Sequence, residues 1–311
     1  MNVDQYWKNV NLNKELHIAG TFIYDAIFCL ERMKHFCYED ECFSFLYNTS
    51  VGIERLEKIV IILLEHNNEK DQEQFEKSLI THNHLDLIKR IAGISSLNLG
   101  KEHKKFLSLL SDFYKSYRYN RFNLPSEIGV DKDQLALTSF VSESLGIEIQ
   151  TNQLFPTKID KQIRSFLGKI IGKIATQLYA IIRDAETYTK ELRYDSKAAK
   201  IFYANEKEYN FVDERICQKE ILVYIMNSQD TNCGLIDFIK SMDPLELDPA
   251  VNNEYINFLF DIKNDTYGVV DEISQIYEDR GFNKERFEML SLIGAEGVSF
   301  DLNDDELFEE N

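Results

Sequence analysis

The sequence is poor in the residues that interrupt helices and form tight turns. Its 311 residues include only 4 prolines and 13 glycines. Sandwiches and barrels of many short strands need such turn residues at close intervals, so an all-β architecture is excluded. Apolar runs are also short. None reaches the roughly 18–20 residues that cross a bilayer, so we expect no membrane contact.

Cysteine is scarce, and its spacing is not that of a metal site. The five cysteines are an odd number, and no two of them form a CxxC motif. We therefore predict reduced thiols in a cytoplasmic protein without a zinc site. The first residues, Met1 to Gln5, lack the basic start and apolar stretch of a secretory signal, which agrees with a cytoplasmic location.

The motifs of common cofactor sites are missing as well. The sequence contains no HExxH, no GxSxG and no dinucleotide-binding fingerprint. Residues 168–174 resemble a phosphate loop, but only three residues separate the two glycines, and Ile174 stands where Ser or Thr would hold magnesium. Because this stretch lies in a helical apolar stripe, we interpret its glycines as helix-packing positions. We expect no cofactor and no metal.

What the sequence does contain is apolar periodicity of the helical type. Hydrophobic residues make up 44% of the chain and charged residues 28%, a globular composition. Apolar residues recur at steps of three and four, which predicts an all-α fold, either a bundle or two helical layers. The predicted helices cover about residues 12–37, 43–65, 83–94, 100–123, 131–145, 159–194, 196–207, 212–228, 249–262 and 283–293.

Charge is unevenly distributed along the chain. The net charge is −18, and residues 201–311 alone hold 8 basic and 26 acidic residues. We expect a helical bundle at 1–125, a helical extension at 126–230 that includes the long helix at 159–194, and an acidic helical region at 231–311. The acidic region is either a solvated surface or a module that recruits a basic partner.

The fourth predicted helix carries a cluster of cations and aromatic residues. Lys115, Arg118 and Arg121 follow one another at steps of three, which places them on one helix face. The aromatic residues between and beside them are Tyr114, Tyr117, Tyr119 and Phe122. Cations interleaved with aromatic rings suit phosphates and stacked bases, so this segment predicts RNA binding. The alternative is that the cations are solvated or pair with acids of residues 201–311.

Several segments of the first 125 residues together resemble HEPN-domain proteins. They are Asn48–Ile59 in the second predicted helix, Thr81–Ile88 at the start of the third, and Phe113–Asn123 at the end of the fourth. The first helix, with Glu15–Gly20, fits the pattern too. The resemblance covers about residues 10–125. It implies an antiparallel helical bundle that forms a homodimer through the fourth helix.

The resemblance also implies a function. Many HEPN proteins are metal-independent endoribonucleases of prokaryotic toxin–antitoxin, CRISPR-associated and antiphage systems. Their motif is an Arg and a His that are separated by four to six residues. The Arg binds the phosphate, and the His moves protons while the RNA 2′-hydroxyl attacks phosphorus. By position, Arg118 takes the Arg role, with Lys115, Tyr119, Asn120 and Arg121 as the residues around the phosphate.

The sequence departs from the family motif at its histidine. The position five residues after Arg118 holds Asn123, and all six histidines of the chain precede it. Asn cannot titrate, and the loss of a general acid or base typically costs about 10²–10⁴ in rate. The groups left to supply a proton path are Tyr119, His82 and His84. The other interpretation of the two histidines is that they are polar residues at a helix start.

These observations leave three hypotheses. The chain is a diverged HEPN-like ribonuclease of a defence or toxin system, with Arg118 and Asn123 at its centre. Alternatively, it is a non-catalytic HEPN-like module that binds RNA or a protein partner. The third hypothesis is a helical scaffold whose acidic last third recruits a basic partner or covers the basic helix. Carboxylate pairs such as Glu54 with Glu57 do not indicate an active site, because acids this frequent usually lie on the surface.

Overall fold

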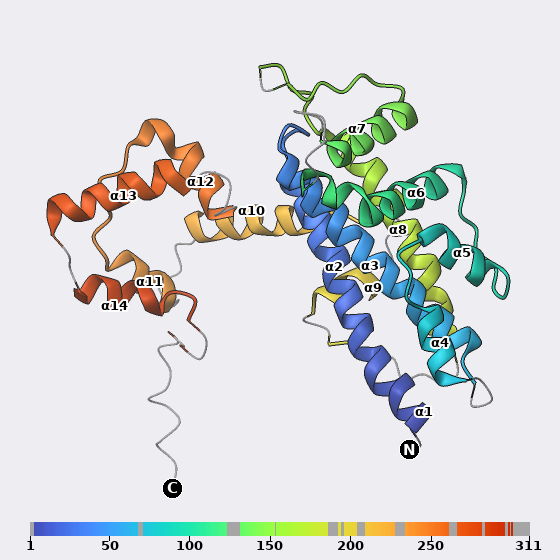
Figure 1. Cartoon of the computed structure of the whole chain (residues 1–311). Coiled ribbons are helices and arrows are strands. Elements are labelled where there is room, and N and C mark those ends of the chain that lie inside the picture. Colours follow the sequence, from blue (N-terminus) through green and yellow to red (C-terminus); the bar gives the residue numbers. More distant parts are fainter. Residues whose placement is uncertain are drawn as a thin grey trace, which may run out of the picture. The chain divides into compact units, whose positions relative to one another are not determined.

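The chain is helical wherever regular structure is described. The computed structural model describes residues 3–67, 71–122, 131–152, 154–185, 192–193, 196–203, 209–227, 234–260, 266–281, 284–295, 298 and 300. Within these ranges no strand is formed, which confirms the predicted all-α class. The chain divides into two compact units, Met1–Phe211 and Val212–Asn311, which are taken in turn (Figure 1).

The first unit is a helical bundle. Its elements are α1 (Val3–Tyr6), the π-helical turn η1 (Trp7–Asn11), α2 (Leu12–Arg32), α3 (Glu39–Glu65), α4 (Gln72–Ser78), α5 (His84–Ala92), α6 (Lys101–Lys115), the 3₁₀ helix η2 (Tyr117–Phe122), α7 (Lys132–Leu145), α8 (Lys161–Asp184) and α9 (Lys197–Tyr203). Helices α2 and α3 form its central hairpin. Helices α5, α6, α7 and α8 pack against α3, and α9 packs against α2.

The core of this unit follows from the apolar stripes of its two central helices. Buried positions at seven-residue spacing are Leu16, Ile23 and Leu30 in α2 and Leu46, Ile53 and Val60 in α3. Seven residues are almost two helical turns, so each stripe lies on one helix face. The buried side chains form one continuous core that extends from Leu12 in α2 to Phe211 at the end of the unit.

Two glycines allow the central helices to approach their neighbours closely. A Cβ atom added at Gly20 of α2 would lie 2.6 Å from the Cα atom of Ala198 in α9. One added at Gly52 of α3 would lie 2.7 Å from Ile23 of α2. The spacing between these helices therefore depends on the missing side chains.

We expect Gly20→Ala to lower the free energy of unfolding by about 1–3 kcal/mol, because the backbone of α9 must move to admit the methyl group. The measurement is chemical denaturation. Gly93→Ala is the matched control, since Gly93 has φ −70° and the nearest atom to an added Cβ lies 3.4 Å away. An equal change in the two variants would contradict the close-packing interpretation.

Three predicted helices end earlier than their apolar pattern suggests. α2 stops at Arg32 instead of residue 37, because Met33 is extended and its carbonyl accepts a hydrogen bond from Arg164 of α8 at 2.8 Å. α8 stops at Asp184 instead of residue 194, where Ala185 turns to an extended conformation. The helix predicted at 100–123 is α-helical only to Lys115.

The compact units also differ from the predicted division at residues 125 and 230. Side chains of α7, α8 and α9 belong to the same core as α2 and α3, so the predicted extension is part of the bundle up to Phe211. The Phe211 ring packs edge-on against Tyr24 and Phe28 of α2, at 5.0 and 5.5 Å between ring centres. The charge shift that suggested the later boundary is a surface property and does not mark where the core ends.

Helix α8 has the length and apolar composition of a membrane-crossing helix, with a mean hydropathy of 1.2 over its most apolar window. More than half of that window is buried within the protein. Ile171, Ile174 and Leu178, for example, have no exposed surface. A helix at the centre of a bundle needs the same composition, so the packing of α8 in the core accounts for it.

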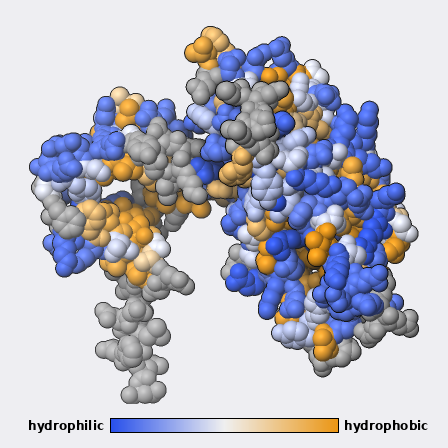
Figure 2. Space-filling model, viewed as in Figure 1, coloured by the Kyte–Doolittle hydropathy of each residue, from blue (hydrophilic) through white to orange (hydrophobic). Residues whose placement is uncertain are grey.

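The second unit holds α10 (Val212–Asn227), α11 (Gly234–Lys240), the 3₁₀ turn η3 (Pro249–Val251), α12 (Asn252–Phe260), α13 (Thr266–Arg280) and α14 (Lys284–Leu292). Among its described residues, only Ile236 and Val269 are buried apolar side chains. Exposed apolar residues are Val212, Ile216, Ile221, Val223, Ile225, Met226, Ile239, Ile256, Leu259, Val270, Phe287, Leu292, Ile293 and Val298. Figure 2 shows such residues gathered on the visible face of this unit.

Candidate functional site

Arg118 lies on two tyrosine rings at the end of α6. Its guanidinium carbon is 3.7 Å from the ring centre of Tyr114 and 4.4 Å from that of Tyr119. Its Nε atom is buried and has no hydrogen-bond partner. The stacked rings hold the guanidinium by cation–π attraction and leave N–H groups to donate. Arg118 is therefore a positioned cation whose Nη groups, and not the buried Nε, are the donors that could bind a phosphate.

The chain reaches this geometry by leaving the α-helix after Lys115. Ser116 has φ −133°, and its hydroxyl donates to the Asp112 carbonyl at 2.8 Å. The next six residues form the 3₁₀ helix η2, which is wound more tightly than an α-helix. The prediction that Lys115, Arg118 and Arg121 share one face of a single α-helix is therefore wrong, because Ser116 interrupts that helix.

His82 lies beside the same tyrosine, although it comes from another part of the chain. It belongs to the short segment between α4 and α5, and its ring centre is 4.4 Å from that of Tyr114. Its side chain is 43% exposed. Arg118 and His82 thus contact the same ring. The distance from the guanidinium carbon to the imidazole centre cannot exceed the sum of their distances to the centre of the Tyr114 ring. A titratable group and a cation for phosphate are brought together here.

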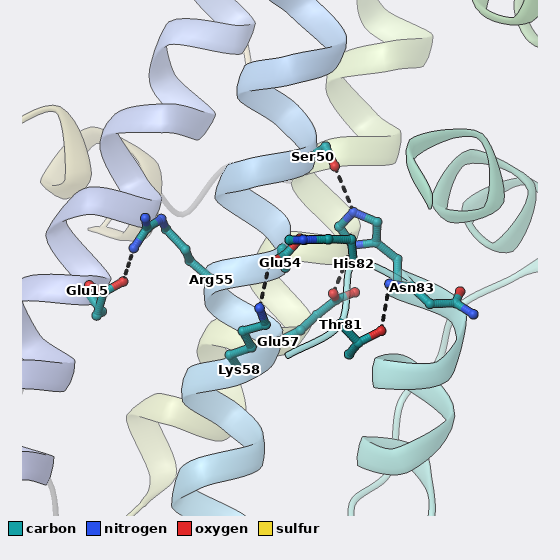
Figure 3. A network of polar contacts seen from close by, with 10 residues as sticks. Glu15, Ser50, Glu54, Arg55, Glu57, Lys58, Thr81, His82 and Asn83 are labelled. Atoms are coloured by element: carbon teal, nitrogen blue, oxygen red, sulfur yellow. Dashed lines mark hydrogen bonds and ion pairs between the residues drawn. The ribbon is translucent and has the colours of Figure 1, made fainter. Parts of the chain in front are cut away.

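Glu54 of α3 orients the imidazole of His82 (Figure 3). Its Oε2 atom is 2.9 Å from His82 Nδ1, and its Oε1 atom accepts from Lys58 Nζ at 2.6 Å. A neutral His82 that donates Nδ1–H to this carboxylate presents the lone pair of Nε2. Only 11% of the Glu54 side chain is exposed, so the pair is shielded on the carboxylate side and open on the imidazole side.

His84, two residues further on, is in the opposite environment. It is the first residue of α5 and is completely buried. Its Nδ1 atom is 2.8 Å from Glu57, its Nε2 atom is 3.0 Å from the Ser50 hydroxyl, and its backbone N–H donates to Ser111 at 3.0 Å. The Ser–His–Glu order resembles a hydrolytic triad. Because Ser50 and His84 are wholly inaccessible, this network joins α3, α5 and α6 and meets no substrate.

The expectation that Glu54 and Glu57 lie on the surface is wrong. Glu57 is fully buried, and burial raises the pKa of its carboxyl group, an effect that His84 opposes. Each carboxylate is paired with one histidine of the 82–84 pair, which is why α3 tolerates them inside the bundle. One sequence feature could have indicated this pairing. Two acids stand three residues apart on one helix, and two histidines stand two residues apart at the start of another.

The other predicted site residues are only partly placed. Lys115 is exposed at the end of α6, and Tyr119 is exposed beside Arg118. Asn120 and Arg121 belong to η2, but their side chains lie outside the described residues, and so does the whole of Asn123. Of the other cations on the predicted basic helix, Lys105 lies 3.6 Å from Glu102 and 3.7 Å from Glu143, both in the first unit.

A groove of about 560 Å³ adjoins this cluster. Glu54 and Tyr114 line it, together with Trp7 from η1 and residues of α2 and α3. Among the residues that the structure describes, no group of three or more His, Cys, Asp or Glu is arranged to hold a metal ion. The chemistry that the described groups offer is phosphate binding by Arg118 and proton transfer by His82.

The chain was also compared with known proteins. No family model matches it, and neither a curated protein nor a solved structure does.

Proposed function

We propose that the chain binds single-stranded RNA at the Arg118–Tyr114–His82 cluster and cleaves it without a metal, as a diverged HEPN-like endoribonuclease of a defence or toxin system. The observation that carries the proposal is the shared ring of Tyr114. It keeps a partly exposed His, oriented by a carboxylate, beside an Arg with unused donors. The HEPN resemblance adds a homodimer formed through α6.

In this proposal His82 takes the place of the missing motif histidine. Arg118 donates hydrogen bonds to the non-bridging oxygens of the phosphate and stabilises the charge that develops there. Nε2 of His82 accepts the proton of the 2′-hydroxyl as its oxygen attacks phosphorus. The bond from phosphorus to the 5′-oxygen breaks, that oxygen takes up a proton, and the products are a 2′,3′-cyclic phosphate and a 5′-hydroxyl end. Glu54 stabilises the imidazolium that forms.

The second candidate function is a module that binds RNA without cutting it. Its support is the absence of any histidine after His103 in the sequence, so that the family's own proton donor is missing. The same Arg118 and tyrosines then hold the RNA backbone and bases. The two functions are distinguished by whether chain scission follows binding.

The test is incubation of the purified full-length protein with mixed single-stranded RNAs in EDTA. We expect cleavage products with cyclic phosphate ends. We expect Arg118→Ala to slow cleavage by roughly 10²–10³-fold, because one preorganised donor group for the phosphate is removed. Arg183→Ala, at an exposed arginine of α8 paired with Asp184, is the matched control and should cleave at the normal rate.

The outcomes separate the two candidates. Binding that weakens with salt, without any cleavage, would favour the non-catalytic module. Cleavage by Arg118→Ala at the rate of the unsubstituted protein would remove Arg118 from the site.

A further inference from the structure

The groove beside the cleavage site has an apolar floor and a charged edge. The floor is formed by Leu12 of α2 and by Val51 and Ile59 of α3, each of which is at least nine-tenths buried. Its volume of about 560 Å³ lies within the range of small-molecule sites, about 300–1,000 Å³. An apolar pocket of this size with a few charged groups suits a flat, polar-edged ring such as a nucleobase.

Two aromatic residues line this groove. Trp7, the only tryptophan of the chain, lines the groove from η1, and Tyr114 lines it from α6. Aromatic side chains bind bases by stacking, largely without regard to their identity. The Tyr114 ring already carries Arg118 and stacks with Tyr47. Trp7 is therefore the ring that would bind a base, and selection among bases must come from the charged edge.

The charged edge holds a donor and an acceptor side by side. Arg55 of α3 donates from Nη1 to Glu15 of α2, and the two side chains are 36% and 39% exposed (Figure 3). The Nε atom of Arg55 is buried without a hydrogen-bond partner. The donors of Arg55 that can reach a base are therefore those of its two Nη groups, of which only Nη1 donates to Glu15. A carboxylate, with two oxygens, also has acceptor capacity beyond one bond.

This pair matches the edge of guanine. Arginine donates to the O6 and N7 atoms of guanine, the commonest specific contact of arginine with a base. The neighbouring N1–H and N2–H groups of guanine are donors, which a carboxylate accepts. Adenine places an amino group where guanine has O6, so it opposes the arginine. Uracil offers one acceptor and one donor at the corresponding positions and is the nearest competitor.

The groove is continuous with the proposed cleavage site. Glu54 and Tyr114 belong to both, since Glu54 holds His82 and Tyr114 carries Arg118. We propose that the groove binds the guanine base of the nucleotide next to the scissile phosphate, so that the chain selects guanosine-containing single-stranded RNA. This inference rests on the proposed function, because the phosphate of that nucleotide must lie at Arg118.

The first measurement is calorimetric titration of the full-length protein with 3′-GMP, 3′-UMP, 3′-AMP and 3′-CMP. We expect 3′-GMP to bind about 10- to 100-fold more tightly than 3′-AMP or 3′-CMP, as bidentate base contacts discriminate. Trp7 fluorescence, excited at long wavelength, reports whether the nucleotide enters this groove. Equal affinity for all four nucleotides, or binding of 3′-GMP that leaves Trp7 fluorescence unchanged, would overturn the inference.

Two variants test the edge itself. Arg55→Lys keeps the charge but loses the planar fork, and Glu15→Gln keeps the shape but loses an acceptor. We expect each to reduce the preference for 3′-GMP over 3′-AMP to less than threefold, while circular dichroism shows an unchanged fold. Arg118→Ala should weaken all four nucleotides and keep their order. A guanine preference that survives both edge variants would contradict the assignment.

Cleavage mapping separates this inference from the proposed function. Cuts confined to positions next to guanosine support both. Cuts at all nucleotides leave the ribonuclease proposal standing and overturn the guanine site. Selective 3′-GMP binding without any RNA cleavage supports the groove and contradicts the catalytic proposal.

Discussion

Replacing His84 by leucine is expected to lower the free energy of unfolding by about 3–5 kcal/mol, because it removes the partner of a buried carboxylate. Glu57 already has one oxygen, Oε1, without a hydrogen-bond partner, and His84→Leu would leave Oε2 unbonded too. Ser50 would also lose the imidazole that it contacts at 3.0 Å. The measurement is urea denaturation followed by circular dichroism.

The size of this effect should depend on pH. Burial raises the pKa of Glu57, so the folded protein keeps the proton to a higher pH than the unfolded chain, whose value is near 4.5. A group of this kind costs stability as the pH rises above the unfolded value. In His84→Leu the opposing influence of the imidazole is gone. The variant is therefore expected to lose more stability at pH 8 than at pH 5.

Two further variants make the result specific. His82→Leu, two residues earlier, should cost no more than about 1 kcal/mol, because its hydrogen bond to Glu54 is partly exposed. The double variant Glu57→Met/His84→Leu should recover much of the lost stability, since replacing both members of a buried pair by apolar residues is often neutral. If His84→Leu unfolds at the same urea concentration as the unsubstituted protein, the buried network does not stabilise the bundle.

Replacing His82 by alanine is expected to slow RNA cleavage strongly and to change the stability of the fold little. RNA cleavage should fall by about 10²–10⁴-fold, the usual contribution of a general acid or base. RNA affinity should stay within about twofold, because the contacts to phosphate come from Arg118. The cleavage rates of the variant and of the unsubstituted protein are measured in single-turnover reactions with a labelled RNA in EDTA. Affinity is measured by filter binding.

The partner of His82 gives a graded version of the same test. Glu54→Gln keeps the shape of the side chain but removes the charge that stabilises an imidazolium, so cleavage should slow less than in His82→Ala. The matched control is His103→Ala in α6, a histidine outside the cluster that should cleave normally. Unchanged cleavage by His82→Ala would rule out His82 as the proton-transfer group, whatever its position beside Tyr114.

The sequence predicted the positions of the central helices because the buried face of each helix follows the local spacing of its apolar residues. The stripes of α2 and α3 lie where the three- and four-residue steps placed them, and α5 begins at His84, one residue from the predicted start. Helix ends were predicted less well. They depend on partners such as Arg164, which reaches the carbonyl of Met33 from 131 residues away.

Only the part of the candidate site whose residues are close in sequence could be predicted. Arg118, Tyr114 and Tyr119 are close in sequence, and the contacts of Arg118 with the two rings follow from that closeness. The approach of His82 to Tyr114, by contrast, depends on how α3, α5 and α6 pack together, and apolar periodicity does not say which helices are neighbours. The same limit hid the pairing of Glu54 with His82.

The end of the first core at Phe211 separates the molecule electrostatically. Every described residue of the candidate site and of the groove lies in Met1–Phe211, whereas nearly all of the excess negative charge lies beyond it. The unit proposed to meet RNA has a net charge close to zero, so the cations of its site act on phosphate without a large opposing field from their own unit. A gene fragment ending at codon 211 would therefore encode every described residue of the proposed site and of the groove in a unit that is nearly uncharged.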